Sequence, residues 1–230
     1  MKNIIIVTCK SWNIKNANNF KKKYRNDFNT FIIENNKCLT YEKITKINPD
    51  YIFFPHWSWI IPKEIYLNYN CIVFHMTDLP FGRGGSPLQN LIEKNIDNTK
   101  ISALKVEKEI DSGKIYLKEN LNLNGSAEEI FIRASKIIFE NMIPKILQNN
   151  IIPKEQEGEI TKFTRRTPEQ SEIKDDFNLE KIYNYIRMLD AEGYPKAFIK
   201  FGDKILKLSR ASMKSEKIIA DVEIMEETNE

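Results

Sequence analysis

The stretch Phe74–Gln89, which reads FHMTDLPFGRGGSPLQ, is the part of the chain from which its fold and chemistry can be worked out. The apolar run Cys71–Phe74 leads into it and predicts a buried strand. The glycines and prolines after His75 predict a loop. His75 therefore ends a strand, and α/β proteins gather their functional side chains at the carboxyl ends of such strands.

A carboxylate follows at Asp111, in the turn sequence Asp111-Ser112-Gly113, 36 residues after His75. An imidazole titrates near neutral pH and suits proton transfer, and a neighbouring carboxylate would orient it and stabilise its charge. We therefore interpret His75 as a general base with Asp111 as its partner. The alternatives are a structural histidine and an ordinary Asp-Ser-Gly turn.

Short β-branched or aromatic runs between turn residues predict a mostly parallel α/β sheet with right-handed crossovers. Ser126 and Glu129 predict a capping box, and Pro144 is expected to end or kink the helix that follows. The expected strands lie at residues 4–8, 29–33, 51–54, 72–75, 101–106 and 114–123, and the expected helices at 18–24, 86–93 and 127–143.

The C-terminal part predicts a small α+β or β-barrel-like subdomain, with a helix at 179–189 and strands at 197–201, 205–208 and 218–224. The expected domains are 1–150 for the main domain, 151–175 for a linker that packs on it, and 176–230 for the subdomain.

Composition excludes some classes of function. The net charge of +3 is too small to indicate nucleic-acid binding by itself. The three cysteines lack metal-ligand spacing, so we expect reduced thiols and no metal site. No apolar run is long enough for a signal peptide or a membrane span, so a cytoplasmic protein without a membrane partner is expected.

The His75 loop, the Asp-x-Gly at the same spacing, and the later segments FTRRTP (163–168) and YPKAF (194–198) together resemble the folate-dependent formyltransferases. This family includes methionyl-tRNA formyltransferase, the enzyme that formylates UDP-aminoarabinose, and other sugar N-formyltransferases. The resemblance implies a Rossmann-like domain, 10-formyltetrahydrofolate as cosubstrate, and catalytic roles for His75 and Asp111. It covers most of residues 50–210.

The resemblance also implies positions for the ligands. The folate pocket would be lined by Trp57, Ser58, Trp59 and Ile60 on one side, and by the segment from Leu104 to Ile110 on the other. Alternatively, the two tryptophans simply pack at the edge of the strand.

Three further residues are candidates for binding the substrate. Arg83 would contact an anionic group, although a solvated loop arginine is the alternative. Lys10 and Trp12 follow the first strand, where α/β proteins bind ligands, and the absence of GxGxxG there argues against NAD.

One position departs from the family pattern, which has asparagine two residues before the histidine, where this chain has Val73. The asparagine amide donates to the formyl oxygen as it becomes an oxyanion, and valine has no donor. Thr77 and His56 are the candidate replacements. A folate or nucleotide-sugar binding protein without catalysis is the alternative.

The C-terminal part is short and of mixed charge, so we expect a small substrate and no nucleic acid. The first choice is a nucleotide-linked amino sugar for surface polysaccharide biosynthesis. The alternatives are methionyl-tRNA formylation and hydrolysis of the folate. Related sugar enzymes are commonly dimers, so a homodimer is one expected oligomeric state.

Overall fold

The computed structural model describes residues 1–226. These residues form two compact units. The first unit comprises residues 1–84, 99–121 and 132–162. The second comprises 85–98, 122–131 and the chain from 163 onward. Neither unit is a continuous segment of the chain, because two early segments belong with the C-terminal part.

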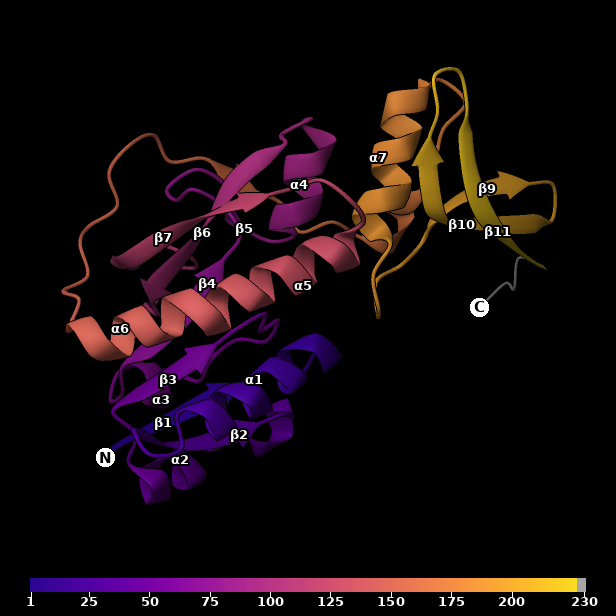
Figure 1. Cartoon of the computed structure of the whole chain (residues 1–230). Coiled ribbons are helices and arrows are strands. Elements are labelled where there is room, and N and C mark those ends of the chain that lie inside the picture. The colour runs from indigo at the N-terminus through magenta and orange to yellow at the C-terminus, as the bar shows by residue number, and fades with distance from the viewer. Residues whose placement is uncertain (227–230) are drawn as a thin grey trace. The chain divides into compact units, whose positions relative to one another are not determined.

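The first unit is built on a six-stranded sheet in the order β2-β1-β3-β4-β6-β7 (Figure 1). The strands β1 to β4 are mutually parallel where they pair, and β6 runs antiparallel to β4. The mostly parallel α/β prediction is therefore confirmed. The strands are β1 Lys2–Val7, β2 Phe28–Ile33, β3 Tyr51–Phe54, β4 Cys71–His75, β6 Asn98–Lys105 and β7 Ile115–Asn122.

The central strands carry continuous apolar runs because the sheet is covered on both faces. Ile4–Val7 have no exposed surface, and Ile52 and Phe53 on the neighbouring β3 are equally buried. Such runs are typical of parallel strands in α/β proteins.

Several helices of the first unit were not predicted, or were predicted too short. Helix α1 is Ser11–Lys23 and begins before the expected residue 18, since Trp12 and Ala17 are already buried on its inner face. The turn Asn36–Cys38 and helices α2 Tyr41–Ile47 and α3 Lys63–Tyr66 were missed. These helices are too short for a periodic pattern, and burial of one residue each, Ile44 and Ile65, ties them to the core.

The long helical segment after Ser126 confirms one prediction and corrects another. Ser126 N donates to Glu129 Oε2 at 2.8 Å and Glu129 N to Ser126 Oγ at 3.3 Å, so the capping box is present. Pro144 was expected to end or kink the helix, and it does not end it. Helix α5 Ala127–Ile137 continues through a π-turn at Ile138–Met142 into α6 Ile143–Asn149. Pro144 therefore lies in the first turn of α6, where the missing N–H of proline is tolerated.

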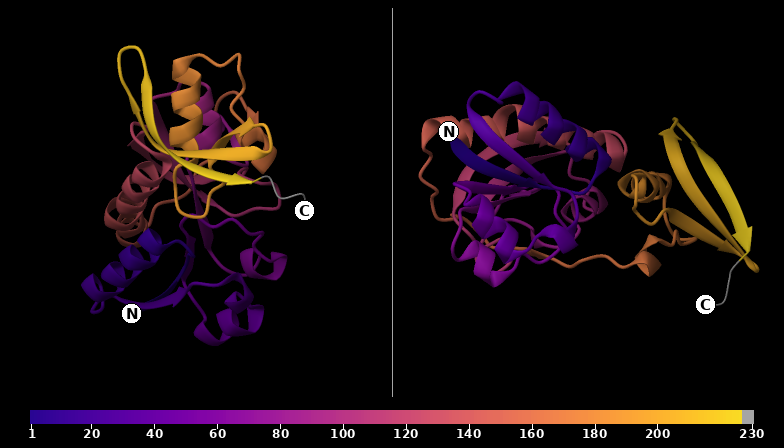
Figure 2. Two further views of the ribbon diagram at one scale, coloured as in Figure 1. Left: turned by 90° about the vertical axis from the view of Figure 1, so that its right-hand side faces the viewer. Right: turned by 90° about the horizontal axis from the view of Figure 1, so that it is seen from below.

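The second unit contains α4 Pro87–Glu93, α7 Leu179–Leu189 and a three-stranded antiparallel sheet of β9 Ala197–Phe201, β10 Lys204–Met213 and β11 Ile218–Glu226. Helix α7 packs against β10 and β9 (Figures 1 and 2). The prediction is thus confirmed in its α+β form. The remaining elements of the chain are the two-residue strands β5 Arg83–Gly84 and β8 Lys162–Phe163, which pair, and a short turn at Pro168–Ser171.

Arg187 anchors α7 inside the second unit. Its guanidinium donates to Leu123 O at 2.7 Å and to Asn184 Oδ1 at 2.7 Å. Burial lowers the pKa of this guanidinium from its usual value. The side chain therefore serves the packing of this unit.

Among residues 1–226, no helix is both long enough and apolar enough to cross a bilayer. Within the same range, no group of three or more His, Cys, Asp or Glu side chains could hold a metal ion.

Candidate active site

His75 is the last residue of β4, and its side chain is 8% exposed. Because side chains alternate along a strand, His75 lies on the same face of β4 as Cys71 and Val73. Both of these residues contribute to a cluster of apolar side chains against that face. The imidazole is therefore held at the end of a rigid, buried strand.

Both ring nitrogens of His75 have oxygen neighbours. Nε2 lies 2.8 Å from Gly82 O, and Nδ1 lies 3.4 Å from Asp111 Oδ2. Gly82 O and an ionised Asp111 carboxylate both only accept hydrogen bonds. The contact of Nε2 is the shorter of the two, so the proton of the neutral ring is assigned to Nε2. This leaves Nδ1 unprotonated beside the carboxylate.

Gly82 is shaped for this contact. Its φ is +73°, a conformation that favours glycine, and it directs the carbonyl oxygen to His75. Its N–H donates to Thr161 Oγ1 at 2.6 Å. The loop that carries the hydrogen-bond acceptor for His75 is therefore fastened to a segment far along the chain.

Asp111 has a left-handed backbone with φ of +55°. Its Oδ2 accepts a hydrogen bond from Gly84 N at 2.9 Å, in addition to lying near His75. The structure thus brings together the two residues that the sequence paired, and the carboxylate is fixed by a backbone N–H.

Val73 stands where the family has the asparagine amide donor, and Thr77 is a candidate replacement for it. Thr77 is fully buried, and its carbonyl oxygen accepts from Ser102 Oγ at 2.7 Å. Thr77 Oγ1 has no hydrogen-bond partner among the described residues. Val73 is partly buried, packs against the apolar cluster and pairs with Leu104 across the sheet.

The residues expected around a folate differ in exposure. Trp57 packs against the apolar cluster, and its ring centroid is 4.7 Å from that of Trp59. Trp57 Nε1 is buried and has no hydrogen-bond partner within the described part of the chain. Leu104 is buried, whereas Ser58, Trp59, Ile60 and Ile110 are exposed.

Lys10, Trp12 and His56 meet where β1 and β3 end. Lys10 Nζ lies 5.9 Å from the Trp12 ring centroid, and the His56 ring is 5.8 Å from Trp12 in an edge-on arrangement. Thr8 Oγ1 donates to Pro55 O at 2.8 Å and joins the two strand ends. Trp12 is 8% exposed, so its face is largely occupied by packing.

The electrostatics of His56 lead to a stability prediction. Burial, followed by the nearby charge of Lys10, lowers the pKa of His56 from 6.5 to about 4. Between these values the unfolded chain binds a proton that the folded chain does not, so this stabilisation is complete above pH 6.5 and lost as the pH falls toward 4. His56→Asn removes the titrating group, and asparagine tolerates the φ of +52° at this position. When the pH is lowered from 7 to 4.5, we expect the unfolding free energy of the variant to fall by about 2 kcal/mol less than that of the wild type.

Urea unfolding at both pH values measures this difference. Comparing the two proteins at the same pH cancels the contributions of all other titrating groups. Equal pH dependence of the two unfolding free energies would contradict the prediction.

Two residues that the sequence analysis missed hold the site together. Gln156 bonds to both Arg83 and the Asp111 turn, and Thr161 bonds to Gly82. Both lie in a polar segment without periodicity, so no local signal marked them. Arg83 directs Nε and Nη2 at Gln156 Oε1, at 3.1 and 2.8 Å.

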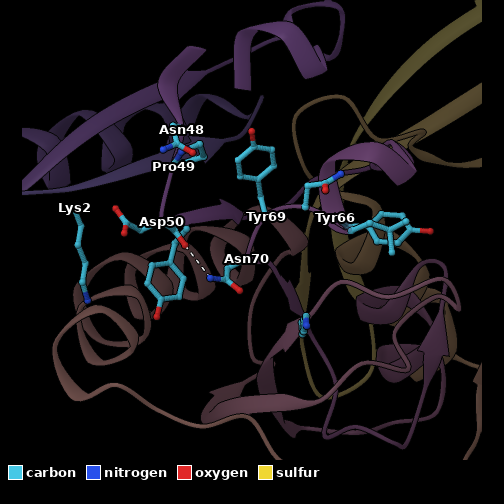
Figure 3. A pocket seen from close by; sticks show the side chains of 11 residues that line it. Lys2, Asn48, Pro49, Asp50, Tyr66, Tyr69 and Asn70 are labelled. Atoms are coloured by element: carbon cyan, nitrogen blue, oxygen red, sulfur yellow. Dashed lines mark hydrogen bonds between the residues drawn. The ribbon is translucent and has the colours of Figure 1, made fainter. Parts of the chain in front are cut away.

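A separate pocket of about 390 Å³ lies at the opposite end of the strands (Figure 3). Lys2 opens β1, and Asp50 and Asn70 precede β3 and β4, so these residues mark the amino ends of the strands. Asn70 Nδ2 donates to Asp50 O at 3.1 Å across this pocket. His75 lies at the other end of β4, and of the predicted site only Lys105, within the segment from Leu104 to Ile110, lines the pocket, so we do not regard it as the active site.

Comparison with known proteins gives consistent matches. A family model described as "Methionyl-tRNA formyltransferase, C-terminal domain" matches residues 168–225. The structure of "Methionyl-tRNA formyltransferase from Clostridium thermocellum" is similar with a TM-score of 0.97 and 66% identity, over 98% of this chain and 100% of that chain.

More distant relatives define the limits of the likeness. A methionyl-tRNA formyltransferase from Rickettsia massiliae is 30% identical over 175 residues, which are 73% of this chain and 57% of that protein. The chain thus spans less than two thirds of the length of this curated relative. A sugar N-formyltransferase from Shewanella sp. has a TM-score of 0.73 and 14% identity, over 94% of this chain and 100% of that one, which indicates a shared fold alone.

Proposed function

Because the chain belongs to the formyltransferase family, we propose that it transfers the formyl group of 10-formyltetrahydrofolate to the amine of methionyl-tRNA. The observation that carries the proposal is the 66% identity over nearly the full length to a protein named methionyl-tRNA formyltransferase. The His75–Asp111 pair supports proton transfer at this site, because His75 Nδ1 lies 3.4 Å from Asp111 Oδ2 and both side chains are largely shielded from solvent.

This reading corrects the substrate expected from the sequence. The nucleotide-linked amino sugar, the link to polysaccharide biosynthesis and the exclusion of a nucleic-acid partner are all contradicted, since the curated relatives and the 66% identical protein are named for methionyl-tRNA. The error came from the shortness and the mixed charge of the C-terminal part. A balance of charges along a segment says little about the local surfaces on which a polyanion binds.

The neutral His75 ring is suited to act as the base. With Nε2–H donating to Gly82 O, Nδ1 can accept the proton from the attacking amine. The cation that results has Asp111 Oδ2 3.4 Å from Nδ1. The new bond joins the amine nitrogen to the formyl carbon, and the bond from that carbon to the folate nitrogen breaks. The proton held by His75 then passes to the folate nitrogen as it leaves.

The folate is assigned to the side of the sheet on which His75 and Val73 lie. Two buried donors, Thr77 Oγ1 and Trp57 Nε1, have no hydrogen-bond partner among residues 1–226. Buried polar atoms are normally satisfied, so unpartnered donors are consistent with a ligand that supplies acceptors. The cosubstrate supplies the formyl carbon and departs as tetrahydrofolate.

The function is tested by incubating the protein with 10-formyltetrahydrofolate and methionyl-tRNA, and measuring formylmethionyl-tRNA together with released tetrahydrofolate. A panel of nucleotide-linked amino sugars serves as the comparison. We expect transfer to methionyl-tRNA, with binding of the tRNA that weakens as salt is raised. Transfer to an amino sugar alone, or release of tetrahydrofolate without any amine, would overturn the proposal.

Thr77 is proposed to donate to the formyl oxygen in place of the missing amide. Thr77→Val keeps the shape and removes the hydroxyl, so we expect kcat to fall by about 100- to 1000-fold. The hydroxyl has no protein partner in the described residues, so its loss should not destabilise the fold. Thr77→Ser is the matched control and should retain activity. A Thr77→Val kcat within threefold of wild type would exclude this role.

A further inference from the structure

The segment Lys154–Phe163 runs beside the catalytic loop and is fastened to it at several points. Lys154 and Ile115 exchange two backbone hydrogen bonds, of 2.9 and 2.7 Å. Farther along, Thr161 O accepts from Arg83 N at 3.0 Å, and Thr161 Oγ1 accepts from Gly82 N. Gln156 lies between these two anchors.

All the hydrogen-bonding capacity of the Gln156 amide is used within the site. Its Oε1 accepts from Arg83 Nε at 3.1 Å and from Arg83 Nη2 at 2.8 Å. Its Nε2 donates to Asp111 O and Gly113 O, both at 2.8 Å. The partners define the orientation of the amide, because a flipped amide would face donors with its NH₂ and carbonyls with its oxygen.

These contacts close a ring around the catalytic carboxylate. Gly84, next to Arg83, donates its N–H to Asp111 Oδ2, while Gln156 joins the Arg83 side chain to the Asp111 backbone. Asp111 has a φ of +55°, a left-handed conformation that aspartate adopts more readily than most non-glycine residues. Gln156 supplies two of the hydrogen bonds that hold the Asp111–Gly113 turn in this conformation.

We propose that Gln156 is a positioning residue that holds Asp111 against His75 for proton transfer. The inference rests on the proposed formyl transfer, but the placement of Asp111 can also be measured without turnover. Gln156 touches neither His75 nor the Asp111 carboxylate in the structure, so it acts through the turn and through Arg83.

The test compares Gln156→Met, which keeps the length and loses all four hydrogen bonds, with Gln148→Met, an exposed position on α6. Because a displacement of about 1 Å in a catalytic group lowers rates by up to about 100-fold, we expect Gln156→Met to lower kcat by about 10- to 100-fold. The KM values for folate and tRNA should stay within about threefold of wild type, as expected for a residue that acts on the chemical step and not on binding. Gln148→Met should behave as wild type.

A second readout is independent of activity. The chain contains two histidines, so ¹⁵N labelling of the imidazole rings gives one set of signals for His75 and one for His56. We expect Gln156→Met to shift the His75 ring signals and leave those of His56 unchanged. A His75→Ala sample assigns the two sets.

The outcomes separate the two proposals. Wild type that does not formylate methionyl-tRNA, with His75 signals that still respond to Gln156→Met, would reject the proposed function and keep the positioning role. Unshifted His75 signals, or a kcat for Gln156→Met within threefold of an active wild type, would overturn the inference.

Discussion

Replacing His75 with alanine is expected to lower kcat for formyl transfer by a factor of about 100 to 10,000, the range that a general base contributes. The variant lacks the nitrogen 3.4 Å from Asp111 Oδ2 that would receive the amine proton. It also lacks the hydrogen bond from Nε2 to Gly82 O. Formylmethionyl-tRNA production in single turnover measures the effect.

Two companions make this result specific. Asp111→Asn keeps a similar shape but removes the negative charge, and it should also abolish most transfer. His56→Asn, the other histidine variant, should leave kcat near wild type at neutral pH. Near-normal turnover in the folded His75→Ala or Asp111→Asn protein would reject the mechanism.

Gly113→Ala is expected to destabilise the protein by about 3 kcal/mol or more and to remove most of the activity. A Cβ at this position would lie 1.9 Å from Lys105 O, a contact that cannot be relieved by a side-chain rotation. The backbone must therefore move, and Gly113 O is one of the two carbonyls that Gln156 holds. The displaced turn carries Asp111 away from His75.

Urea unfolding and the formylation assay together check this prediction. Gly202→Asn is the matched control, since a Cβ there meets nothing within 4 Å and asparagine tolerates its φ of +61°. We expect a change below about 1 kcal/mol for the control. If both variants lose the same stability, the close approach at Gly113 would not be the cause.

The pairing of His75 with Asp111 could be predicted from the sequence because each partner lies in a local pattern, and the structure places them 3.4 Å apart. His75 ends a buried apolar run, and Asp111 stands in a short turn sequence, so burial and turn propensity mark both positions. The strands of the main sheet were predictable from their short apolar runs between turn residues, and helix α7 from the helical repeat of its apolar residues.

Local patterns were insufficient where tertiary contacts overrode propensity. Pro144 predicts an end or a kink of the helix, yet the helix does not end there: a π-turn precedes the proline and the buried face of α6 continues the helix. Helices α2 and α3 are too short to show a period and form because Ile44 and Ile65 reach the core. Their existence depends on burial against distant strands.

The sequence by itself determined the fold class, because this follows from periodicity and turn chemistry, and the resemblance of its motifs indicated the family and the pairing of His75 with Asp111. The tertiary structure alone decided which nitrogen of His75 faces the carboxylate, and that Gln156 and Thr161 fasten the site. Gln156 lies 73 residues from Arg83 and 45 from Asp111, and Thr161 lies 79 from Gly82. Hydrogen bonds over such separations arise from the packing of whole segments, which leaves no periodic signal in the residues that form them.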